Sequence, residues 1–349
     1  MADSGGHWNN LAAAQKLTQS MKIPGVFEED IKRNNPIERV RVGQAAGTGL
    51  KFEWLREKPA NVATLEAAVA DIDIGEALTW TKDVDYEEKN TELKRSYIQR
   101  KLDHFVQSIY GTYNNYEARL LLECEKALKR KLGARLIYAD VNSSVKMFDG
   151  IHAWARQTSG DLNIDQGEVG LSLEKLRLMI DAMKMGCDEI WAPFEIIRKM
   201  DAAYQERGFT WTVGTNLLSF LSLGYNELGK RVLFWDALPI IRTDFLVAEN
   251  PNVGLTATAS DIRTLHSAGD KQYSMFGVKH GNVLNQEPGL TYVFGGTTGF
   301  GDFYKLVRFP ELENYDAGGL RMVNYGAVLL GSSLCLGRIA DIEDIAITV

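Results

Sequence analysis

The sequence has little of what usually marks a catalytic or metal site. Its three cysteines, Cys124, Cys187 and Cys335, lie far apart and form no CxxC pair, so we interpret them as free thiols of a reducing compartment. The five histidines form no HExxH motif, and no GxSxG sequence is present. His152 is interpreted as a packed side chain beside Trp154. We therefore predict no catalytic residues, no cofactor and no metal, and the protein is not expected to be an enzyme.

Two stretches come nearer to a binding site without reaching one. The glycine-rich segment 295–301 lacks the GK[ST] sequence that brings a lysine to bound phosphates, so we interpret it as a loop between strands. Asp71, Asp73, Asp83 and Asp85 lack the regular ligand spacing of an EF-hand. They are interpreted as solvated turn residues.

Negative charges outnumber positive ones, and long apolar runs are absent from the sequence. The formal net charge is -7, whereas proteins that neutralise phosphates normally have a basic surface. Any contact with DNA is therefore expected to be weak and non-specific. No stretch reaches the ~18 apolar residues of a membrane span, and the first residues do not resemble a signal peptide. We expect folding in the cytosol and no membrane partner.

The length and composition are those of a folded protein with a substantial core. A chain of 349 residues with 45% apolar and 24% charged residues is long enough for roughly two domains. Residues 1–38 mix glycine, asparagine and charge and read as an arm. From Val40 to Asp85, short alternating segments separated by turn residues predict a long β-ribbon. Because a two-stranded ribbon is at best marginally stable alone, it needs a neighbouring surface.

Helices are predicted in the next part of the chain. Apolar residues at spacings of three to five predict one amphipathic helix over 91–109 and a second over 113–133, ending at Gly133. The basic run from Lys126 to Lys131 would then lie in the last turns of the second helix. A third helix is predicted over 171–186, with Ser172 as its N-cap.

The remainder of the chain indicates an α+β fold. Residues 188–208 are predicted to begin extended and to become helical at Pro193, which suits the first position of a helix. Further strands are predicted in the segments 230–247, 272–281, 289–296, 303–309 and 319–342.

The order of these parts resembles the major capsid proteins of tailed bacteriophages, which have the Hong Kong 97-type fold. Residues 125–157 carry the resemblance, and within them Phe148, Asp149, Gly150 and Ile151 match the FDGL-like turn after the long spine helix. Residues 171–183 and 228–244 are similar to the helix and the strand that follow. The sequence departs from the pattern at Ala139, where many members have glycine, and in the additional helix expected at 91–109.

The resemblance implies an N-terminal arm, an extended β-hairpin loop, a peripheral domain with a spine helix, and an apical domain of mixed sheet and helices. We expect the arm at 1–38, the β-loop at 39–86, the peripheral domain at 87–186 together with part of 272–340, and the apical domain at 187–271. Residues 272–349 are expected to supply late strands that return to the peripheral domain, and the C-terminal strand.

The implied function is that of a coat protein. It would form pentamers and hexamers of itself and build an icosahedral head around double-stranded DNA in the host cytoplasm, with a scaffolding protein, a portal and a possible decoration protein as partners. Two alternatives are an encapsulin-type nanocompartment shell and an unrecognised α+β enzyme. Candidate residues for contact between subunits are on the arm and the ribbon: Trp8, Lys51, Phe52, Glu53, Trp54, Arg56 and Lys58.

Overall fold

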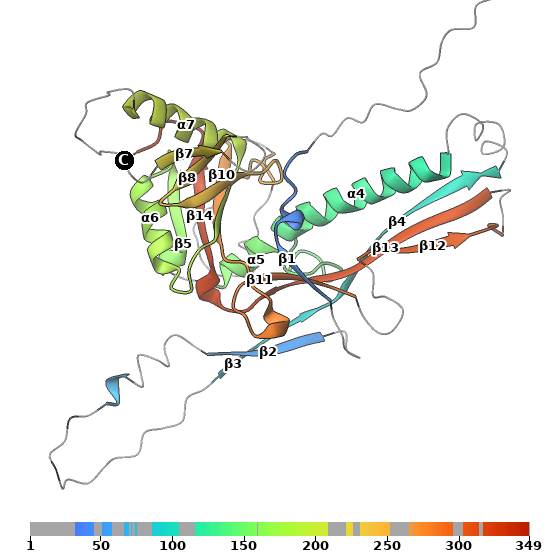
Figure 1. The fold of residues 1–349 in the computed structure, drawn as a ribbon, viewed down its shortest axis with the longest axis horizontal. Helices are drawn as coiled ribbons and strands as arrows, with labels where there is room; N and C mark the ends of the chain where they lie inside the picture. The colour runs from blue at the N-terminus through green and yellow to red at the C-terminus, as the bar shows by residue number, and fades with distance from the viewer. Residues whose placement is uncertain are drawn as a thin grey trace, which may run out of the picture.

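The computed structural model of the chain contains two mixed sheets, a long helix and a projecting two-stranded ribbon (Figure 1). It describes residues 32–44, 51–57, 66–69, 71, 74, 86–104, 116–158, 160–208, 221–225, 231–251, 265–267, 269–295, 303–313 and 317–348. Outside these residues lie several predicted features, namely Trp8, Lys58, most of the acidic residues between 71 and 85, and residues 296–301 of the glycine-rich loop.

A five-stranded sheet is built around the 14-residue strand β13 (Ala317–Leu330). One edge of β13 pairs with β4 (Lys94–Asp103), and the other pairs first with β12 (Lys305–Phe309) and then with β11 (Leu290–Phe294). The short strand β1 (Arg41–Gln44) adds in parallel to β11. Residues 41–44 therefore belong to this sheet and not to the ribbon.

A seven-stranded sheet occupies the other end of the molecule, in the order β5-β14-β10-β6-β9-β8-β7. Strands β8 and β9 form a hairpin whose turn residues, Asp236 and Ala237, both have positive φ. The segment 230–247, predicted as strand, is therefore interrupted by a turn at Asp236 and Ala237. The strands are β5 (Asn163–Val169), β6 (Glu189–Ala192), β7 (Leu221–Tyr225), β8 (Arg231–Trp235), β9 (Leu238–Arg242), β10 (Gln272–Val278) and β14 (Leu336–Glu343).

Local start signals place two helices beside this sheet. α6 (Leu173–Ala182) begins after Ser172, whose hydroxyl accepts a hydrogen bond from the N–H of Lys175, as predicted. α7 (Phe194–Gly208) follows β6 directly, with Pro193 just before its first residue. The short helices are α5 (Ile151–Arg156) and the 3₁₀ turns η1 (Pro36–Glu38), η2 (Gly160–Leu162), η3 (Val283–Asn285) and η4 (Ser333–Cys335).

The long helix α4 (Tyr116–Tyr138) was predicted to end at Gly133, but it runs five residues further. Gly133 is needed for a close approach instead, because a Cβ there would lie 2.1 Å from Oδ1 of Asn35. Asn35 caps η1 and donates its side-chain N–H to the carbonyl of Lys129, 2.9 Å away. The basic run Lys126 to Lys131 consequently lies within the helix rather than in its last turn.

The helix predicted over 91–109 is wrong for the residues that the structure describes. They form β3 (Tyr86–Glu92) and β4, and β4 pairs with ten consecutive residues of β13. Ile98 and Leu102 are four residues apart, a spacing that suits a helix face and one face of a strand equally well. Pairing with a strand more than 200 residues away decides between the two.

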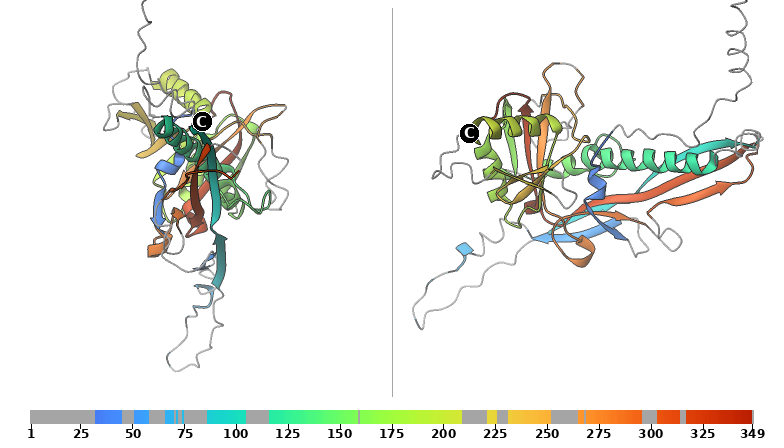
Figure 2. Two further views of the ribbon diagram at one scale, coloured as in Figure 1. Left: turned by 90° about the vertical axis from the view of Figure 1, so that its right-hand side faces the viewer. Right: turned by 45° about the horizontal axis from the view of Figure 1, so that its top comes forward.

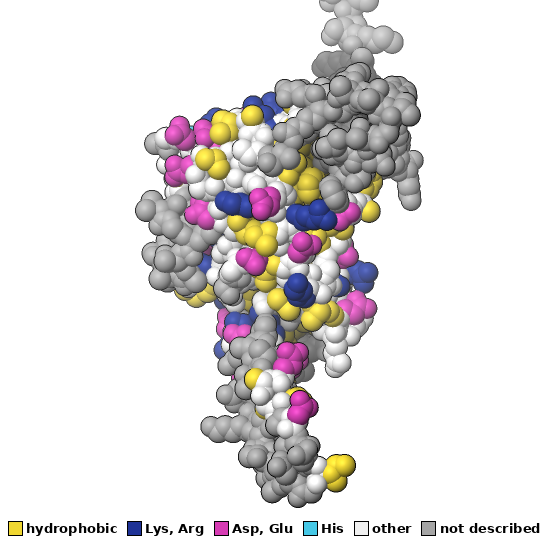
Figure 3. Space-filling view, turned by 90° about the vertical axis from the view of Figure 1, so that its left-hand side faces the viewer, with side chains coloured by type: hydrophobic (Ala, Val, Ile, Leu, Met, Phe, Trp, Pro, Cys, Tyr) yellow, Lys and Arg dark blue, Asp and Glu magenta, His cyan; other side chains and the backbone are white. Residues whose placement is uncertain are grey.

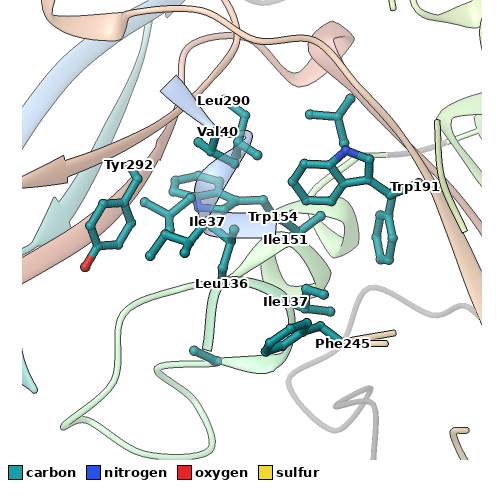
Figure 4. Close-up of a cluster of buried hydrophobic side chains, with 14 of the residues drawn as sticks. Ile37, Val40, Leu136, Ile137, Ile151, Trp154, Trp191, Phe245, Leu290 and Tyr292 are labelled. Carbon is teal, nitrogen blue, oxygen red and sulfur yellow. The ribbon is translucent and has the colours of Figure 1, made fainter. Parts of the chain in front are cut away.

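The main core lies where the two sheets meet. Side chains from α4, α5, both sheets and the segment before β1 converge there around Trp154 and Trp191, as Figure 4 shows. A second cluster fills the space between α6, α7 and the seven-stranded sheet, with Leu176, Met179 and Ile197 almost fully buried.

The predicted domain boundaries stay predictions. Strand pairing nevertheless groups β10 and β14, both from the segment 272–349, with β5 and β6 in the seven-stranded sheet, whereas β11, β12 and β13 form the other sheet with β4. The late part of the chain thus contributes to both sheets.

Candidate assembly surfaces

The ribbon consists of β2 (Lys51–Glu57) paired with β3 in antiparallel register, Lys51 opposite Glu92 and Glu57 opposite Tyr86. Successive side chains of a strand point to opposite faces. One face, with Phe52, Trp54 and Arg56, lies against the chain's own body, and the other is exposed. The ribbon's two faces are therefore different surfaces.

Aromatic packing holds the inner face of the ribbon in place. The ring of Trp54 lies 5.9 Å from that of the buried Trp154, centroid to centroid. Phe52 packs against the small cluster of Val293 and Leu329. These two aromatic side chains, predicted to contact another subunit, are used largely within the chain.

Arg56, next to the C-terminal end of β2, anchors the ribbon to the end of β13. Its guanidinium donates to the carbonyl of Leu330 at 2.8 Å and to that of Gly331 at 3.3 Å. Burial lowers the pKa of Arg56, and the charge of Glu87 acts in the opposite direction. A buried guanidinium that donates to two backbone carbonyls fixes the ribbon's exit from the body.

The outer face of the ribbon is acidic with two apolar side chains. Leu55 is 69% exposed and Tyr86 63% exposed. Around them the register places Glu53, Glu57, Glu88 and Glu92. Glu92 pairs with Lys51 at 3.8 Å and with Lys94, at the start of β4, at 2.7 Å.

A second exposed surface is the face of β4, β13 and β12 that points away from α4. Helix α4 covers one side of these strands (Figure 2). The register puts Tyr97 beside Val323, and Val323 beside Lys305, on the opposite side. Tyr97 is 56% exposed there. We call this surface the open sheet face.

The open sheet face is predominantly basic. Arg95 lies over the ring of Tyr97 at 5.6 Å, and Arg321 over that of Phe309 at 4.9 Å. Both are cation–π contacts, which keep the two guanidinium groups close to aromatic rings of the sheet. The register also places Lys101 and Lys305 on this face, together with one acidic residue, Asp103. It is thus opposite in charge to the outer face of the ribbon.

The ribbon and the open sheet face are parts of one continuous strand. Only Leu93, which is buried, separates β3 from β4. The ribbon therefore extends away from the five-stranded sheet, and Figure 1 shows it projecting from the body on the side remote from α4. A chain cannot lay the outer face of its own ribbon on its own open sheet face.

The four motif residues have structural roles after α4. Phe148 is buried edge-to-face against Tyr292, with ring centroids 6.2 Å apart, and Ile151 is fully buried. Asp149 accepts from the N–H of Val141 at 3.0 Å, and burial raises the pKa of its carboxyl. A Cβ at Gly150 would lie 2.7 Å from the carbonyl oxygen of Arg135. The FDGI sequence thus folds the loop tightly against the end of α4.

An ion pair that sequence reasoning missed joins the segment before β1 to the seven-stranded sheet. Arg39 donates to both carboxylate oxygens of Glu189, at 2.7 and 2.9 Å. Trp191 donates its indole N–H to Glu189 at 3.0 Å, and Nε2 of His280 lies 3.4 Å away. Burial alone would raise the pKa of Glu189, but the hydrogen bonds from His280, Arg39 and Trp191 together outweigh it and lower the pKa to about 2.

Other chemistry is sparse among the residues that the structure describes. No group of three or more His, Cys, Asp or Glu side chains in them is arranged to hold a metal ion. Burial raises the pKa of the Cys187 thiol to about 12, so it is protonated and unreactive at neutral pH. Within the same part of the chain, no helix has the length and apolar character needed to cross a bilayer.

Comparisons with known proteins relate the chain to shell proteins by structure alone. No family model and no curated protein matches the sequence. The SrpI encapsulin of Synechococcus elongatus superposes with a TM-score of 0.65 at 10% identity, covering 97% of each chain. The capsid of a native GTA particle gives 0.56 at 12% identity, covering 93% of this chain and 94% of that one. The capsid of cyanophage P-SCSP1u gives 0.55 at 10% identity, covering 93% of each.

At these identities the comparison establishes a fold, and the coverage shows that it extends over nearly the whole chain. The mixed α+β architecture predicted from the sequence is confirmed. The chain has the Hong Kong 97-type fold that phage capsid proteins and encapsulins share.

Proposed function

We propose that this protein is the major capsid protein of a tailed bacteriophage. It assembles into pentamers and hexamers that form an icosahedral head around double-stranded DNA, and its location is the virion. The fold supports a shell-forming role, and the neighbours of that fold are structural proteins. One observation on this chain carries the proposal: it exposes two surfaces of opposite charge that it cannot bring together itself.

The acidic outer face of the ribbon and the basic open sheet face fit a contact between copies. Leu55 and Tyr86 on the first surface match Tyr97 on the second, so apolar groups meet at the centre and charges at the rim. Because the two surfaces differ, the contact is heterologous, and such contacts generate rings when the rotation closes. Of the residues predicted to contact another subunit, Lys51 and Glu53 lie on the outer face of the ribbon and would take part in this contact. Arg56 lies on the inner face and holds the ribbon against its own subunit.

The remaining partners follow from the proposed role. A scaffolding protein, a portal and a possible decoration protein would join the shell during assembly in the host cytoplasm. The net charge of -7 keeps contact with the packaged DNA weak and non-specific. Figure 3 supports this expectation for one face, because side chains of both signs are interspersed over the end that carries the seven-stranded sheet.

The second candidate is an encapsulin-type shell that encloses protein cargo. It is favoured by the superposition on the SrpI encapsulin, which covers 97% of each chain with a TM-score of 0.65. Both candidates use the same contact between copies and differ in what the shell holds.

The experiment is to express the full chain, purify it and measure its mass by light scattering, with negative-stain imaging of the same fractions. The proposal predicts rings or closed shells of megadalton mass, alone or with the scaffolding protein supplied by co-expression of the neighbouring genes. A stable monomer or dimer under both conditions would refute it. Nuclease-protected DNA in particles from infected cells supports the phage capsid, and a protein cargo instead supports the encapsulin.

A further inference from the structure

Residues 32–40, which lead into β1, lie between α4 and the seven-stranded sheet. The side chains of Ile37 and Val40 are 4% and 3% exposed and reach into the main core, as Figure 4 shows. The polar groups on either side of them make contacts of their own, and these contacts go to different parts of the molecule in turn. We call residues 32–40 the clasp.

The first part of the clasp is bound to the seven-stranded sheet. The backbone N–H of Arg33 donates to Oδ2 of Asp244 at 2.8 Å, and the side chain of Asn34 donates to the carbonyl of Arg242 at 2.8 Å. The hydroxyl of Thr243 donates back to the carbonyl of Asn34 at 2.9 Å. These partners lie at the end of β9 and just after it, so the three hydrogen bonds tie the clasp to that sheet.

The middle of the clasp is bound to α4 instead. The side-chain N–H of Asn35 donates to the carbonyl of Lys129 at 2.9 Å, and Nζ of Lys129 lies 2.5 Å from a carboxylate oxygen of Glu38. Gly133, one turn further along α4, leaves the space that Asn35 fills. Because α4 packs on β4 and β13, this part of the clasp is joined to the side of the molecule that contains the five-stranded sheet.

The last part of the clasp returns to the seven-stranded sheet. Arg39 donates to both carboxylate oxygens of Glu189 in β6, at 2.7 and 2.9 Å. Strand β1 follows at once and pairs with β11 of the five-stranded sheet. Contacts along the clasp therefore alternate between the two sides of the molecule. A segment bound in this way resists movement of one side relative to the other.

The charged contacts of the clasp lie near the surface, unlike its apolar ones. The side chains of Glu38, Lys129 and Arg39 are 52%, 40% and 40% exposed. Ion pairs in such positions contribute little individually, because water and salt screen them. A segment held by several weak contacts of this kind opens locally at a lower cost than a sheet unfolds.

We propose that the clasp is a releasable restraint that holds the seven-stranded sheet against α4. When it opens, each side keeps its own strand pairing, and the junction between the two sides loosens. One hydrogen bond outside the clasp reports on that junction. The N–H of Val247, after β9, donates to the hydroxyl of Tyr138 at the end of α4, at 3.1 Å.

The clasp is a property of the single subunit, and its test does not depend on the shell role. One consequence does rest on the proposed function. If the chain forms both pentamers and hexamers, an open clasp would let the two sides of a subunit take different angles in the two kinds of ring.

The first test is amide hydrogen exchange of the full chain at low urea concentrations, resolved to single residues. The N–H groups of Glu38, Arg39 and Val40 bond within the clasp, to the carbonyls of Asn35 and Pro36. They should exchange through a local opening that depends little on urea, with protection at least on the order of tenfold lower than in β10. Equal protection and equal urea dependence in the clasp and β10 would make the clasp an integral part of the core and overturn the proposal.

Arg39→Gln removes the ion pair at one end of the clasp. Exchange should rise at the N–H of Arg33, at the other end, and at that of Val247 beyond it. The rise should be on the order of threefold to tenfold, which corresponds to one lost polar contact. Arg41→Gln is the matched control, because it removes an exposed ion pair with Glu287 that stays beside the five-stranded sheet. It should leave exchange at Arg33 and Val247 unchanged.

Asn34→Gly opens the clasp from its first part. Asn34 has a φ of 53°, which glycine adopts readily, so the substitution removes the side-chain bond to Arg242 without straining the backbone. Exchange should rise at Val40 and Val247 by a similar factor.

Three results with these variants would contradict the clasp. A rise confined to the neighbours of each substitution would show that the contacts are independent. An equal rise in β10 would show that the fold as a whole is weakened. A rise within the clasp with an unchanged Val247 would show that the clasp does not hold the junction.

Discussion

The two sheets of this molecule differ in how completely their strands are buried within the chain. In the seven-stranded sheet, every residue of β10 and nearly every residue of β14 is buried, and α6 and α7 pack against it. At the far end of the five-stranded sheet, β12 has no fully buried residue and β4 has only two. The centre of the seven-stranded sheet is a completed core, whereas the far end of the five-stranded sheet has one side left open. This difference indicates which part of the chain folds by itself and which part is built for a partner.

The largest effect is expected in the completed region. Trp191→Ala removes a side chain that is 1% exposed, at the centre of the core. Substitutions of this kind cost about 3–5 kcal/mol in the free energy of unfolding, because of lost burial and the cavity left behind. Urea unfolding followed by circular dichroism would measure it. A loss below about 1 kcal/mol would mean that this region is not the completed core described here.

The ion pair between Arg39 and Glu189 should make the contact between the segment before β1 and the seven-stranded sheet sensitive to strong acid. The pKa of Glu189 is lowered from 4.5 to about 2 in the folded chain, so its contribution is fully present above pH 4.5 and is lost as the pH falls through 2. The shift corresponds to about 2–3 kcal/mol once solvent screening is allowed for. Glu189→Gln should flatten the pH dependence of unfolding between pH 5 and pH 2. An unchanged slope would contradict the role of this pair.

The base of the ribbon should depend on Arg56 far more than on its exposed neighbour. Arg56→Met leaves the carbonyls of Leu330 and Gly331 without their donor and should cost about 1–3 kcal/mol. Amide exchange in β2 would report the loosened ribbon. Lys51→Met, on the outer face of the same strand, is the matched control and should change neither exchange nor stability appreciably. Equal effects of the two substitutions would mean that the inner face does not anchor the ribbon.

Gly133→Ala tests the close approach of η1 to α4. Alanine favours a helix over glycine by about 1 kcal/mol, yet we expect a net loss of about 1–2 kcal/mol, since the added Cβ would overlap Asn35. Adding Asn35→Ala relieves the overlap, so thermal unfolding of the double variant should show much less than the sum of the two single losses. Additive losses would show that the contact is not the reason for the glycine.

The smallest effect on stability is expected on the open sheet face. Tyr97→Ala removes an aromatic ring as Trp191→Ala does, but the ring is 56% exposed, so stability should stay within about 0.5 kcal/mol of the wild type. Assembly, measured by light scattering, should nevertheless fail or slow markedly. Normal assembly of this variant would remove Tyr97 from the proposed contact.

Features fixed by neighbouring residues were predicted well from the sequence. The N-cap at Ser172 and the strand-to-helix change at Pro193 depend on residues within one turn, and both are seen in the structure. The alternation within residues 51–57 correctly predicted a strand, which has two faces. It could not say which face is inward, because that depends on Trp154 and on the carbonyls after β13.

Features that depend on distant residues were missed. The strands at 86–103 were taken for a helix because their partner β13 lies more than 200 residues away. Gly133 was taken for a helix end because its reason is Asn35, about 100 residues earlier. His152 was correctly interpreted as packed, but its contacts with Glu249 and Arg338 lie 97 and 186 residues further along the chain.

The most direct test of the central claim is a charge exchange between the two exposed surfaces. One variant carries Glu53→Lys and Glu88→Lys on the ribbon, a second carries Arg95→Glu and Lys101→Glu on the open sheet face, and a third combines all four. Light scattering should show that the first two variants fail to assemble, whereas the combined variant regains the mass of the wild-type assembly, because opposite charges again face each other between copies. If the combined variant assembles no better than the first two, or if the first two assemble normally, these surfaces do not meet in the shell.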